Sequence, residues 1–453
     1  IRRPPRSTLF PYTTLFRFCH TLPILPPMRW TTTDCSHTMP DRLTITRPER
    51  PIDAVIDLPR SKSVANRLLI LASLAGDPGA VKDPGSAEDT RLLRNLLRDR
   101  PRVMHCGMGG TVFRFLLAWA AVREGREHII TGDARLLKRP HQPLVDALRL
   151  LGADIGAVDN GYRVRGRRLA GGTIVMDAPL SSQFISALLL IAPLMENGLY
   201  LRWTGTRLSE PYVLMTMLAM EHFDVPPLVD HDGIRVRARP LRAKPCLVPP
   251  DWSAASFWFE VVALAGNARI LLRDLHRDRW QGDEAACRLW KPWVRADSTD
   301  QGVLLTCERS PGFGDGHQEL RFNLRDHPDR FQPLALTCAG LGQAARFTGL
   351  ENLHVKETDR IAAVIDSLVE LGIRPELPEN GFSLPFVRDP LGSVPHPDRA
   401  FNTFGDHRMA MSLAPLALRT GRITLRDPGV VAKSYPGFWE GLRKAGFHVG
   451  TGV

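Results

Sequence analysis

One pattern recurs six times along the chain and limits what it can fold into. A cluster of small or charged polar residues opens an apolar helical run, which ends at Gly or at a charged residue. The runs cover residues 61–76, 109–125, 181–198, 253–266, 329–342 and 405–421. They are nearly apolar on every helical face, so each is predicted to form a helix that is buried on all sides.

A second, amphipathic run follows each apolar one. These runs cover residues 88–99, 141–155, 211–225, 282–294, 359–373 and 436–449. Short stretches typical of strands fall between and after the helices. The repeat is strand, buried helix, strand, amphipathic helix and further strands, with a period of about 50 to about 80 residues. Six copies predict an α/β fold of two similar domains, each with three repeats whose helices lie inside sheets.

The length of 453 residues also favours more than one hydrophobic core. The best Pro-rich linker covers residues 242–252, between the third and fourth copies. Residues 1–38 lack periodicity and resemble a translated sequencing adapter fused to an open reading frame. We therefore expect them to be a non-native or disordered tail, with Met39 as the start; a basic, acid-poor transit peptide is the alternative.

The composition narrows the classes of partner. Net charge is +11, but the basic residues are dispersed rather than gathered in a block, which argues against nucleic-acid binding. The seven Cys show neither a CxxC pair nor zinc-ligand spacing, so we expect thiols in a reducing compartment and no metal site. The longest apolar run, residues 184–195, is too short to cross a bilayer. We expect a cytoplasmic protein with no membrane or nucleic-acid partner.

The starts of the apolar helices carry the chemistry. A helix N-terminus offers free N–H groups and a positive dipole end, and both attract anions. Several starts add a cation, and one adds hydroxyls and an amide: Lys62, Arg67, Arg114 and Arg408, and Ser181, Ser182 and Gln183. Each start alone fits an ordinary cap beside a surface charge. Their recurrence predicts a cleft lined for phosphate and carboxylate groups.

The stretch HVKETDRIAAV, residues 354–364, has two interpretations. Lys356, Glu357, Asp359 and Arg360 could form a solvated helix start, or a site that holds an anion and moves a proton beside it. Lys356 and Arg360 are four residues apart, so we expect them to share a helix face with Glu357 beside them. Asp359 also fits a simple N-terminal helix charge.

Six segments together resemble the signature segments of the EPSP synthase family. They are LPRSKSVANR, GGTVFRF, SSQFISALLLIAPL, HVKETDR, GDHRMAMS and DPGVVAKSYPGFW, in that order, and the match runs from about residue 43 to the C-terminus. The resemblance implies two similar domains of three βαβαββ units each, an inside-out α/β barrel of the enolpyruvyl transferase type, with the active site between them. It implies that the chain crosses twice, with residues 39–59 plus 251–453 as domain I and residues 60–250 as domain II.

The resemblance also implies the reaction. Members of this family transfer the enolpyruvyl group of phosphoenolpyruvate to the 5-hydroxyl of shikimate 3-phosphate and release phosphate, in the shikimate pathway to aromatic amino acids. It implies a monomer without cofactor or metal, acting on these two small molecules. Glyphosate is expected to compete with phosphoenolpyruvate beside Gly110.

Site roles are likewise carried over from the family. Asp329 is implied as the base at the hydroxyl and Glu357 as the acid/base at the methylene, with Lys62 as a third catalytic group. Shikimate 3-phosphate is implied to contact Lys62, Ser63, Arg67, Ser181, Ser182, Gln183, Ser209, Asp329, Asn352 and Lys356. Phosphoenolpyruvate is implied to contact Lys62, Gly110, Arg135, Gln183, Arg360, Arg408 and Lys433.

The chain departs from the family pattern at Met108, where Asn or Asp is usual, and at His354, where Arg is usual. Two alternatives stay open. A UDP-N-acetylglucosamine enolpyruvyl transferase would share the fold and donor, but none of the seven Cys is a convincing match for its loop cysteine. A non-catalytic basic binding protein would bind oligonucleotides in a salt-sensitive way and show no turnover.

Overall fold

The computed structural model describes residues 40–177, 181–205, 209–307, 318–379, 381–388, 391 and 400–451. Residues 39–453 form one compact unit, to which every element named below belongs. The predictions made for residues 1–38 and for Met39 lie outside the described residues.

Two hydrophobic cores form inside this unit. The first core takes its buried residues from 43–56 and 252–447, and the second takes them from 64–248. Fully buried tryptophans occur in both, Trp119 in the second core and Trp252, Trp258, Trp290 and Trp439 in the first. The predicted domain limits, residues 39–59 with 251–453 and residues 60–250, stay a prediction.

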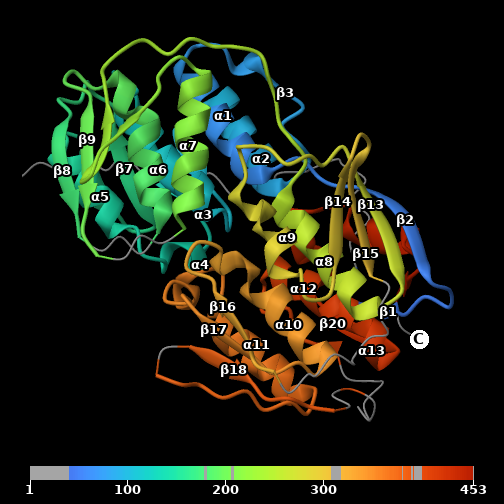
Figure 1. Cartoon of the computed structure of the whole chain (residues 1–453). Helices are drawn as coiled ribbons and strands as arrows, with labels where there is room; N and C mark the ends of the chain where they lie inside the picture. Colours follow the sequence, from blue (N-terminus) through green and yellow to red (C-terminus); the bar gives the residue numbers. More distant parts are fainter. Residues whose placement is uncertain are drawn as a thin grey trace, which may run out of the picture. The chain divides into compact units, whose positions relative to one another are not determined.

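Three sheets belong to the second core. In spatial order they are β4 (Val103–His105), β5 (Glu127–Thr131), β7 (Gly161–Arg165) and β6 (Asp154–Val158); β10 (Leu228–Val229), β11 (Gly233–Val236), β9 (Leu199–Trp203) and β8 (Gly172–Met176); and the pair β12 (Cys246–Leu247) and β3 (Val81–Lys82). Strands β7, β8 and β9 stand beside helices α5 and α6 in Figure 1.

Three further sheets belong to the first core. They are β19 (Ala400–Phe401), β20 (Arg422–Arg426), β1 (Arg42–Thr46) and β21 (His448–Gly450); β14 (Arg295–Thr299), β15 (Gly302–Cys307), β13 (Ala268–Arg273) and β2 (Ile52–Asp57); and β16 (Leu320–Asn323), β17 (Ala345–Thr348) and β18 (Phe382–Leu384). Strand β1 pairs with β20 and β21, with Leu43 opposite Leu425. The beginning and the end of the described chain therefore share one sheet.

The six predicted buried helices are confirmed. They are α1 (Lys62–Leu74), α3 (Gly110–Ala121) and α6 (Ser182–Ile191) in the second core, and α8 (Trp252–Ala265), α10 (Phe331–Leu341) and α12 (His407–Leu413) in the first. Every residue of α10 is buried, and α3 and α8 each have a single residue that is not. Because these helices have no polar face, they pack on one another: α3 contacts α1 and α6, and α10 contacts α8 and α12.

The amphipathic runs also form helices. They are α2 (Glu88–Asp99), α5 (Gln142–Leu150), α7 (Glu210–His222), α9 (Ala286–Leu289), α11 (Arg360–Glu370) and α14 (Phe438–Lys444). The expected helix over 282–294 is only the turn η3 (Gly282–Ala285) and α9. Pro292 explains the early end, since the residue before a proline avoids helical geometry.

Short helices complete the described chain. They are η1 (Pro78–Ala80), α4 (Ala134–Leu137), η2 (Ala192–Leu194), η4 (Pro328–Arg330), η5 (Leu353–Val355), η6 (Ala414–Leu416), α13 (Ala417–Thr420) and η7 (Pro428–Lys433).

The chain passes between the two cores twice, and the two passages lie side by side. The Ser61 N–H donates to the Pro249 carbonyl at 2.8 Å, and the Asp251 N–H donates to the Pro59 carbonyl at 2.9 Å. Arg60 and Pro250 form an antiparallel bridge between these bonds. The connection is thus a short two-stranded crossing.

Candidate active site

A small cavity of about 70 Å³ lies where helix starts from both cores meet. The starts of α1, α3, α6 and α7 reach it from the second core, and η4, α12 and the segment before α11 reach it from the first. Six cationic side chains and three carboxylates line it: Lys62, Arg67, Arg139, Lys356, Arg360 and Arg408, and Asp89, Asp329 and Glu357. Larger hollows of about 950 Å³ and 1070 Å³ lie elsewhere, but no predicted site residue lines either of them.

The Asp329 carboxylate lies among three cations. Arg360 Nη1 donates to it at 2.7 Å, Lys356 Nζ lies at 3.2 Å and Arg408 Nη2 at 3.3 Å. Burial alone would raise the pKa of Asp329, but Lys356, Arg408 and Arg360 together hold that pKa well below its usual range. Asp329 is therefore ionised and able to accept a proton.

Glu357 has a similar environment on the other side of Arg360. Arg360 Nη2 lies 2.9 Å from its carboxylate, Lys433 Nζ at 3.1 Å and Arg139 Nη1 at 4.0 Å. Burial opposes ionisation, but Lys433, Arg360 and Arg139 bring the pKa of Glu357 well below its usual range. The two predicted proton-transfer residues are thus charged. Three cations face each of them, and Arg360 is common to both.

Arg360 connects these two carboxylates. Its Nε donates to Asp406 at 2.8 Å, so the planar guanidinium bonds three carboxylates at once. The expectation that Lys356 and Arg360 share a helix face is wrong: Lys356 follows η5, and α11 begins only at Arg360. Both side chains nevertheless reach Asp329, because the chain turns between them.

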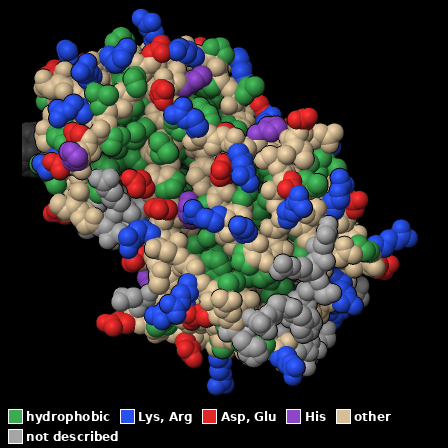
Figure 2. All heavy atoms as spheres, in the orientation of Figure 1, with side chains coloured by type: hydrophobic (Ala, Val, Ile, Leu, Met, Phe, Trp, Pro, Cys, Tyr) green, Lys and Arg blue, Asp and Glu red, His purple; other side chains and the backbone are tan. Residues whose placement is uncertain are grey.

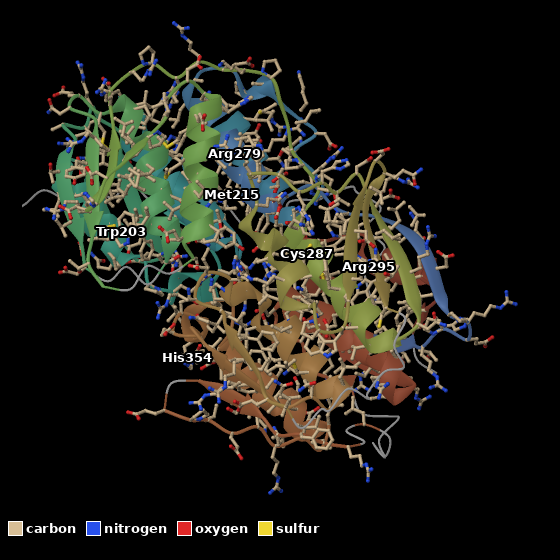
Figure 3. All side chains as sticks on the ribbon, viewed as in Figure 1. Trp203, Met215, Arg279, Cys287, Arg295 and His354 are labelled. Carbon is tan, nitrogen blue, oxygen red and sulfur yellow. The ribbon has the colours of Figure 1, made fainter. Side chains whose placement is uncertain are left out.

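Asp359 and His354 lie outside the cavity lining. Asp359 caps α11 by accepting from the N–H groups of Ile361 and Ala362, both at 3.1 Å, which confirms the helix-charge interpretation. His354 Nδ1 lies 2.8 Å from the Asp359 carboxylate, and its side chain is exposed (Figure 3). The departure at His354 therefore does not change a lining residue.

The start of α1 supplies Lys62, Ser63 and Arg67. Lys62 Nζ pairs with Asp89 at 2.9 Å. Arg67 is 2% exposed and gives its hydrogen bonds to protein groups, including Thr216 and the carbonyls of Ser63 and Tyr212. Lys62 thus faces an acid, Asp89, and a substrate anion would replace this acid as the partner of Lys62. Arg67 instead holds α1 and α7 together.

The hydroxyl and amide groups of the site also line the cavity. Ser181 caps α6 by accepting from the Gln183 N–H at 3.3 Å, and Gln183 Oε1 accepts from Arg114 Nη1 at 2.6 Å. Ser182 and Ser209 complete this group. Asn352 is 3% exposed, and its Oδ1 has no hydrogen-bond partner within the described part of the chain, so it is available to a ligand.

Arg135 is not brought into the cavity. Its Nη1 donates to the Phe404 carbonyl at 2.9 Å in an exposed position, while Arg139, four residues later, lines the cavity. The two arginines flank the end of α4, which is a single helical turn, so the sequence alone does not tell which of them turns inward. The cavity lining therefore includes Arg139 and not Arg135.

All other predicted residues line the cavity except Lys433, which joins it through Glu357, and Arg114, whose Nη1 donates to the lining residue Gln183 at 2.6 Å. Sequence reasoning missed the lining residues Arg139, Asp89, Thr111, Tyr212 and His407. His407 lies inside the quoted segment GDHRMAMS, and Asp89 lies in the amphipathic run 88–99. Nothing in the sequence pattern pointed to Tyr212.

Gly110 allows Arg139 to lie against the start of α3. A Cβ at Gly110 would lie 2.5 Å from Arg139 Nη1, so any side chain here would displace the guanidinium. Nearby, Lys433 Nζ donates to the Met108 carbonyl at 3.2 Å. This contact uses the backbone of Met108, so it does not depend on the unusual side chain.

His407 adds a neutral polar group. It is 2% exposed, and burial together with Lys62, Arg408 and Lys433 holds its pKa well below the usual range. Across the described segments, no group of three or more His, Cys, Asp or Glu side chains could hold a metal ion.

On the face shown in Figure 2, Lys and Arg side chains alternate with Asp and Glu. No described helix is both long enough and apolar enough to cross a membrane.

Comparison with known proteins identifies relatives along most of the chain. Residues 95–442 match the family described as EPSP synthase (3-phosphoshikimate 1-carboxyvinyltransferase). The 3-phosphoshikimate 1-carboxyvinyltransferase of Bacteroides fragilis is 38% identical over 408 residues, which cover 88% of this chain and 97% of that protein. The protein of the same name from Methanospirillum hungatei is 32% identical over 429 residues, covering 87% and 96%.

Solved structures show the same fold. An EPSP synthase from Acinetobacter baumannii has a TM-score of 0.69 at 22% identity and covers 90% of this chain and 100% of its own. An enolpyruvyl transferase from Streptomyces tendae has a TM-score of 0.65 at 16% identity, covering 90% and 98%. The predicted two-domain enolpyruvyl transferase fold is thereby confirmed. The chain matches these relatives along most of its length, and its helix starts gather around a cationic cavity. It belongs to the EPSP synthase (3-phosphoshikimate 1-carboxyvinyltransferase) family.

Proposed function

We propose that this cavity transfers the enolpyruvyl group of phosphoenolpyruvate to the 5-hydroxyl of shikimate 3-phosphate, with Asp329 and Glu357 moving the protons. The observation that carries the proposal is the pair of partly buried carboxylates bonded to one guanidinium, that of Arg360, inside a ring of cations. Two substrates with a phosphate and a carboxylate each need such a ring, and a proton transfer needs the carboxylates.

The chemistry assigns a role to each carboxylate. Protonation of the phosphoenolpyruvate methylene makes C2 electrophilic, and the 5-hydroxyl oxygen then bonds to C2 while its proton passes to a base. In the second step the C2–O bond to phosphate breaks and the new methyl group loses a proton, which restores the double bond. We assign the base at the hydroxyl to Asp329 and the proton exchange at the methylene to Glu357, with Lys62 as a third catalytic group.

The cations facing Asp329 and Glu357 explain how carboxyl groups with such low pKa values can take part in proton transfer. In the structure Lys356, Arg360 and Lys433 are paired with the two carboxylates. Substrate phosphates and carboxylates compete for these cations, and the added negative charge raises the pKa of both acids. Binding therefore brings Glu357 toward the range in which it can carry a proton.

The binding groups form two sets, one for each substrate, which share Lys62 and Gln183. For shikimate 3-phosphate we propose Lys62, Ser63, Arg67, Ser181, Ser182, Gln183, Ser209, Asp329, Asn352 and Lys356. For phosphoenolpyruvate we propose Lys62, Gly110, Arg139, Gln183, Arg360, Arg408 and Lys433. Arg139 stands in this set in place of Arg135 because it lines the cavity, as Gly110 does.

Each set draws residues from both cores, so we also propose that residues 39–59 with 251–453 and residues 60–250 are domains that move on binding. The cavity of about 70 Å³ is smaller than a usual ligand site, and substrates must displace its ion pairs or open it. We further propose a cytoplasmic monomer whose partners are small molecules.

A phosphate-release assay tests the proposal. Release is expected only when phosphoenolpyruvate and shikimate 3-phosphate are both present. Turnover with UDP-N-acetylglucosamine in place of shikimate 3-phosphate would identify the other enolpyruvyl transfer reaction. Salt-sensitive oligonucleotide binding without any turnover would favour the non-catalytic protein.

A further inference from the structure

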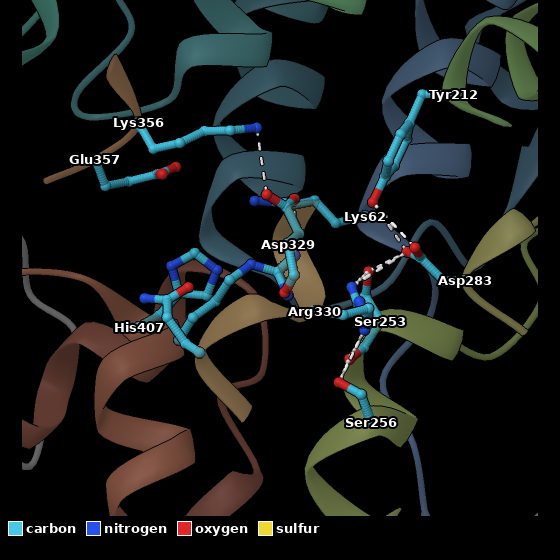
Figure 4. Close-up of polar contacts among 12 residues, drawn as sticks. Lys62, Tyr212, Ser253, Ser256, Asp283, Asp329, Arg330, Lys356, Glu357 and His407 are labelled. Carbon is cyan, nitrogen blue, oxygen red and sulfur yellow. Dashed lines mark hydrogen bonds and ion pairs between the residues drawn. The ribbon is translucent and has the colours of Figure 1, made fainter. Parts of the chain in front are cut away.

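A buried polar cluster lies behind the cavity wall, and the reaction described above does not use it. It consists of Tyr212, Ser253, Asp283 and Arg330 (Figure 4). Asp283 is 4% exposed and Arg330 is fully buried. A buried charge pair of this kind is costly unless its remaining donors and acceptors are satisfied.

The start of α8 accepts hydrogen bonds from both terminal nitrogens of Arg330, whereas Arg330 Nε has no partner among the described residues. Its Nη1 donates to the Ser253 carbonyl at 2.9 Å and to Ser256 Oγ at 2.8 Å, and its Nη2 donates to Ser253 Oγ at 2.8 Å. Nη2 also lies 3.4 Å from the Asp283 carboxylate. Arg330 directly follows Asp329 in η4, so these bonds fix the turn that carries the proposed base.

Asp283 joins this cluster to the second core. Tyr212, which lies on α7 and lines the cavity, donates its hydroxyl hydrogen to Asp283 Oδ2 at 3.0 Å, and Ser253 Oγ also bonds Asp283. Burial and the nearby Asp283 charge raise the pKa of Tyr212, so the phenol keeps the hydrogen that it donates. One carboxylate thus connects α7 with Arg330.

The backbone around this contact is equally close. A Cβ at Gly282 would lie 2.3 Å from Pro211 Cβ, so Gly at this position permits η3 to touch the start of α7. The Ser209 N–H donates to the Arg325 carbonyl at 3.1 Å beside it. The start of α7 is therefore seated on the first core at several adjacent points, and Asp283 is the charged one.

The charge of Asp283 has a second consequence. Arg330 and Asp329 are neighbours in sequence, and a guanidinium without its own carboxylate would be drawn toward Asp329. Asp283 offsets the Arg330 charge and leaves Asp329 to Lys356, Arg360 and Arg408.

We propose that Asp283 is a positioning residue that couples the seating of α7, through the Tyr212 hydroxyl, to the orientation of Asp329, through Arg330. The inference rests on the proposed role of Asp329 as the base. When α7 is seated, the contacts Tyr212–Asp283–Arg330 hold η4 so that the Asp329 carboxylate faces the cavity. When the contacts are lost, substrates still bind, but the base is misplaced.

Steady-state kinetics of Tyr212→Phe, Asp283→Asn and the double variant test this coupling. Tyr212→Phe keeps the ring that lines the cavity and removes only the hydroxyl. Each single variant is expected to lower kcat on the order of 10- to 100-fold, the usual effect of a misplaced catalytic group, with KM for both substrates within about threefold of wild type. The double variant is expected to be no slower than Asp283→Asn, because both changes break the same chain of contacts.

Tyr200→Phe is the matched control. It removes another tyrosine–aspartate hydrogen bond, 2.9 Å long and made to Asp230, and neither residue lines the cavity. This variant is expected to retain wild-type kinetics. Wild-type turnover in the same assay shows that the proposed function holds, so a failure of the coupling is distinguishable from a failure of the function.

Three results would overturn the coupling: a kcat of Tyr212→Phe within twofold of wild type, a change in KM alone, or losses that multiply in the double variant. Should Asp283→Asn fail to fold by circular dichroism, Tyr212→Phe decides by the same criterion on kcat.

Discussion

Replacing Glu357 by Gln removes the negative charge and the oxygen that can take up a proton, while keeping the shape of the side chain. In the structure this carboxylate faces Arg360 at 2.9 Å, Lys433 at 3.1 Å and Arg139 at 4.0 Å. If Glu357 exchanges the methylene proton, Glu357→Gln should lower kcat on the order of 10²- to 10⁴-fold, the range for a general acid–base group.

Glu357→Gln should not weaken the binding of phosphoenolpyruvate, although it lowers kcat. Gln leaves the three facing cations with less negative charge among them, so they compete less with an internal carboxylate for the substrate anions. Calorimetric titration should therefore give a Kd for phosphoenolpyruvate, in the presence of shikimate 3-phosphate, that is equal to or lower than that of wild type. A loss of turnover with retained or tighter binding separates a chemical role from a binding role.

Glu351→Gln is the control, because Glu351 is exposed and lies in the same segment outside the cavity lining. It should leave both kcat and Kd unchanged. Turnover of Glu357→Gln within threefold of wild type, or an equal loss in Glu351→Gln, would refute the assignment of the proton transfer to Glu357.

Three further predictions follow from other contacts. Arg139→Met should raise KM for phosphoenolpyruvate at least tenfold and Arg135→Met less than threefold in the same steady-state assay; the reverse order would restore Arg135 to the site. Gly110→Ala places a methyl carbon 2.5 Å from Arg139 Nη1, so the Arg139 guanidinium has to move. Because glyphosate is the longer molecule and is expected to lie closer to residue 110, inhibition curves at several phosphoenolpyruvate concentrations should show its binding weakened more than that of phosphoenolpyruvate, and equal weakening would contradict the expected crowding. Burial raises the pKa of Glu260 well above its usual 4.5, and neither carboxyl oxygen has a hydrogen-bond partner among the described residues. The folded state therefore loses stability as pH rises from the unfolded pKa toward the folded one, at about 1.4 kcal/mol per pH unit. Glu260→Met should remove this slope and melt higher at pH 8, and identical pH dependence in the two proteins would show that Glu260 is ionised or solvated.

The helices that build the site were predictable because burial leaves a strong mark on the sequence. A helix such as α10, buried at every residue, has to be apolar all round, and its polar start then stands out. The helix starts also hold Lys62, Ser181 and Arg408 in a fixed direction, since each lies within the first turn or just before it. Their convergence on one cavity was predicted from the recurrence of such starts, and the resemblance implied it as well.

Contacts made by short or irregular segments were not predictable in the same way. Arg135 and Arg139 lie on either side of the end of a single helical turn, and only the path of the chain after α4 turns Arg139 inward. Lys356 reaches Asp329 from the residue after η5 and not from a helix face. Tyr212 lies on α7, and the prediction that this run is amphipathic is wrong, because its polar and apolar residues give no marked face. The approach of Tyr212 to Asp283 therefore depends on tertiary packing alone.

Hydrogen exchange at the transferred carbon tests the central claim most directly. The claim is that residues of this cavity add a proton to the phosphoenolpyruvate methylene and then remove one. If the reaction is run in D₂O with both substrates, proton NMR of the product should show deuterium in the enolpyruvyl methylene, because the transient methyl group rotates before it loses a hydrogen. Phosphate release with a product whose methylene carries no deuterium would contradict the account, as would release with no product formed at all.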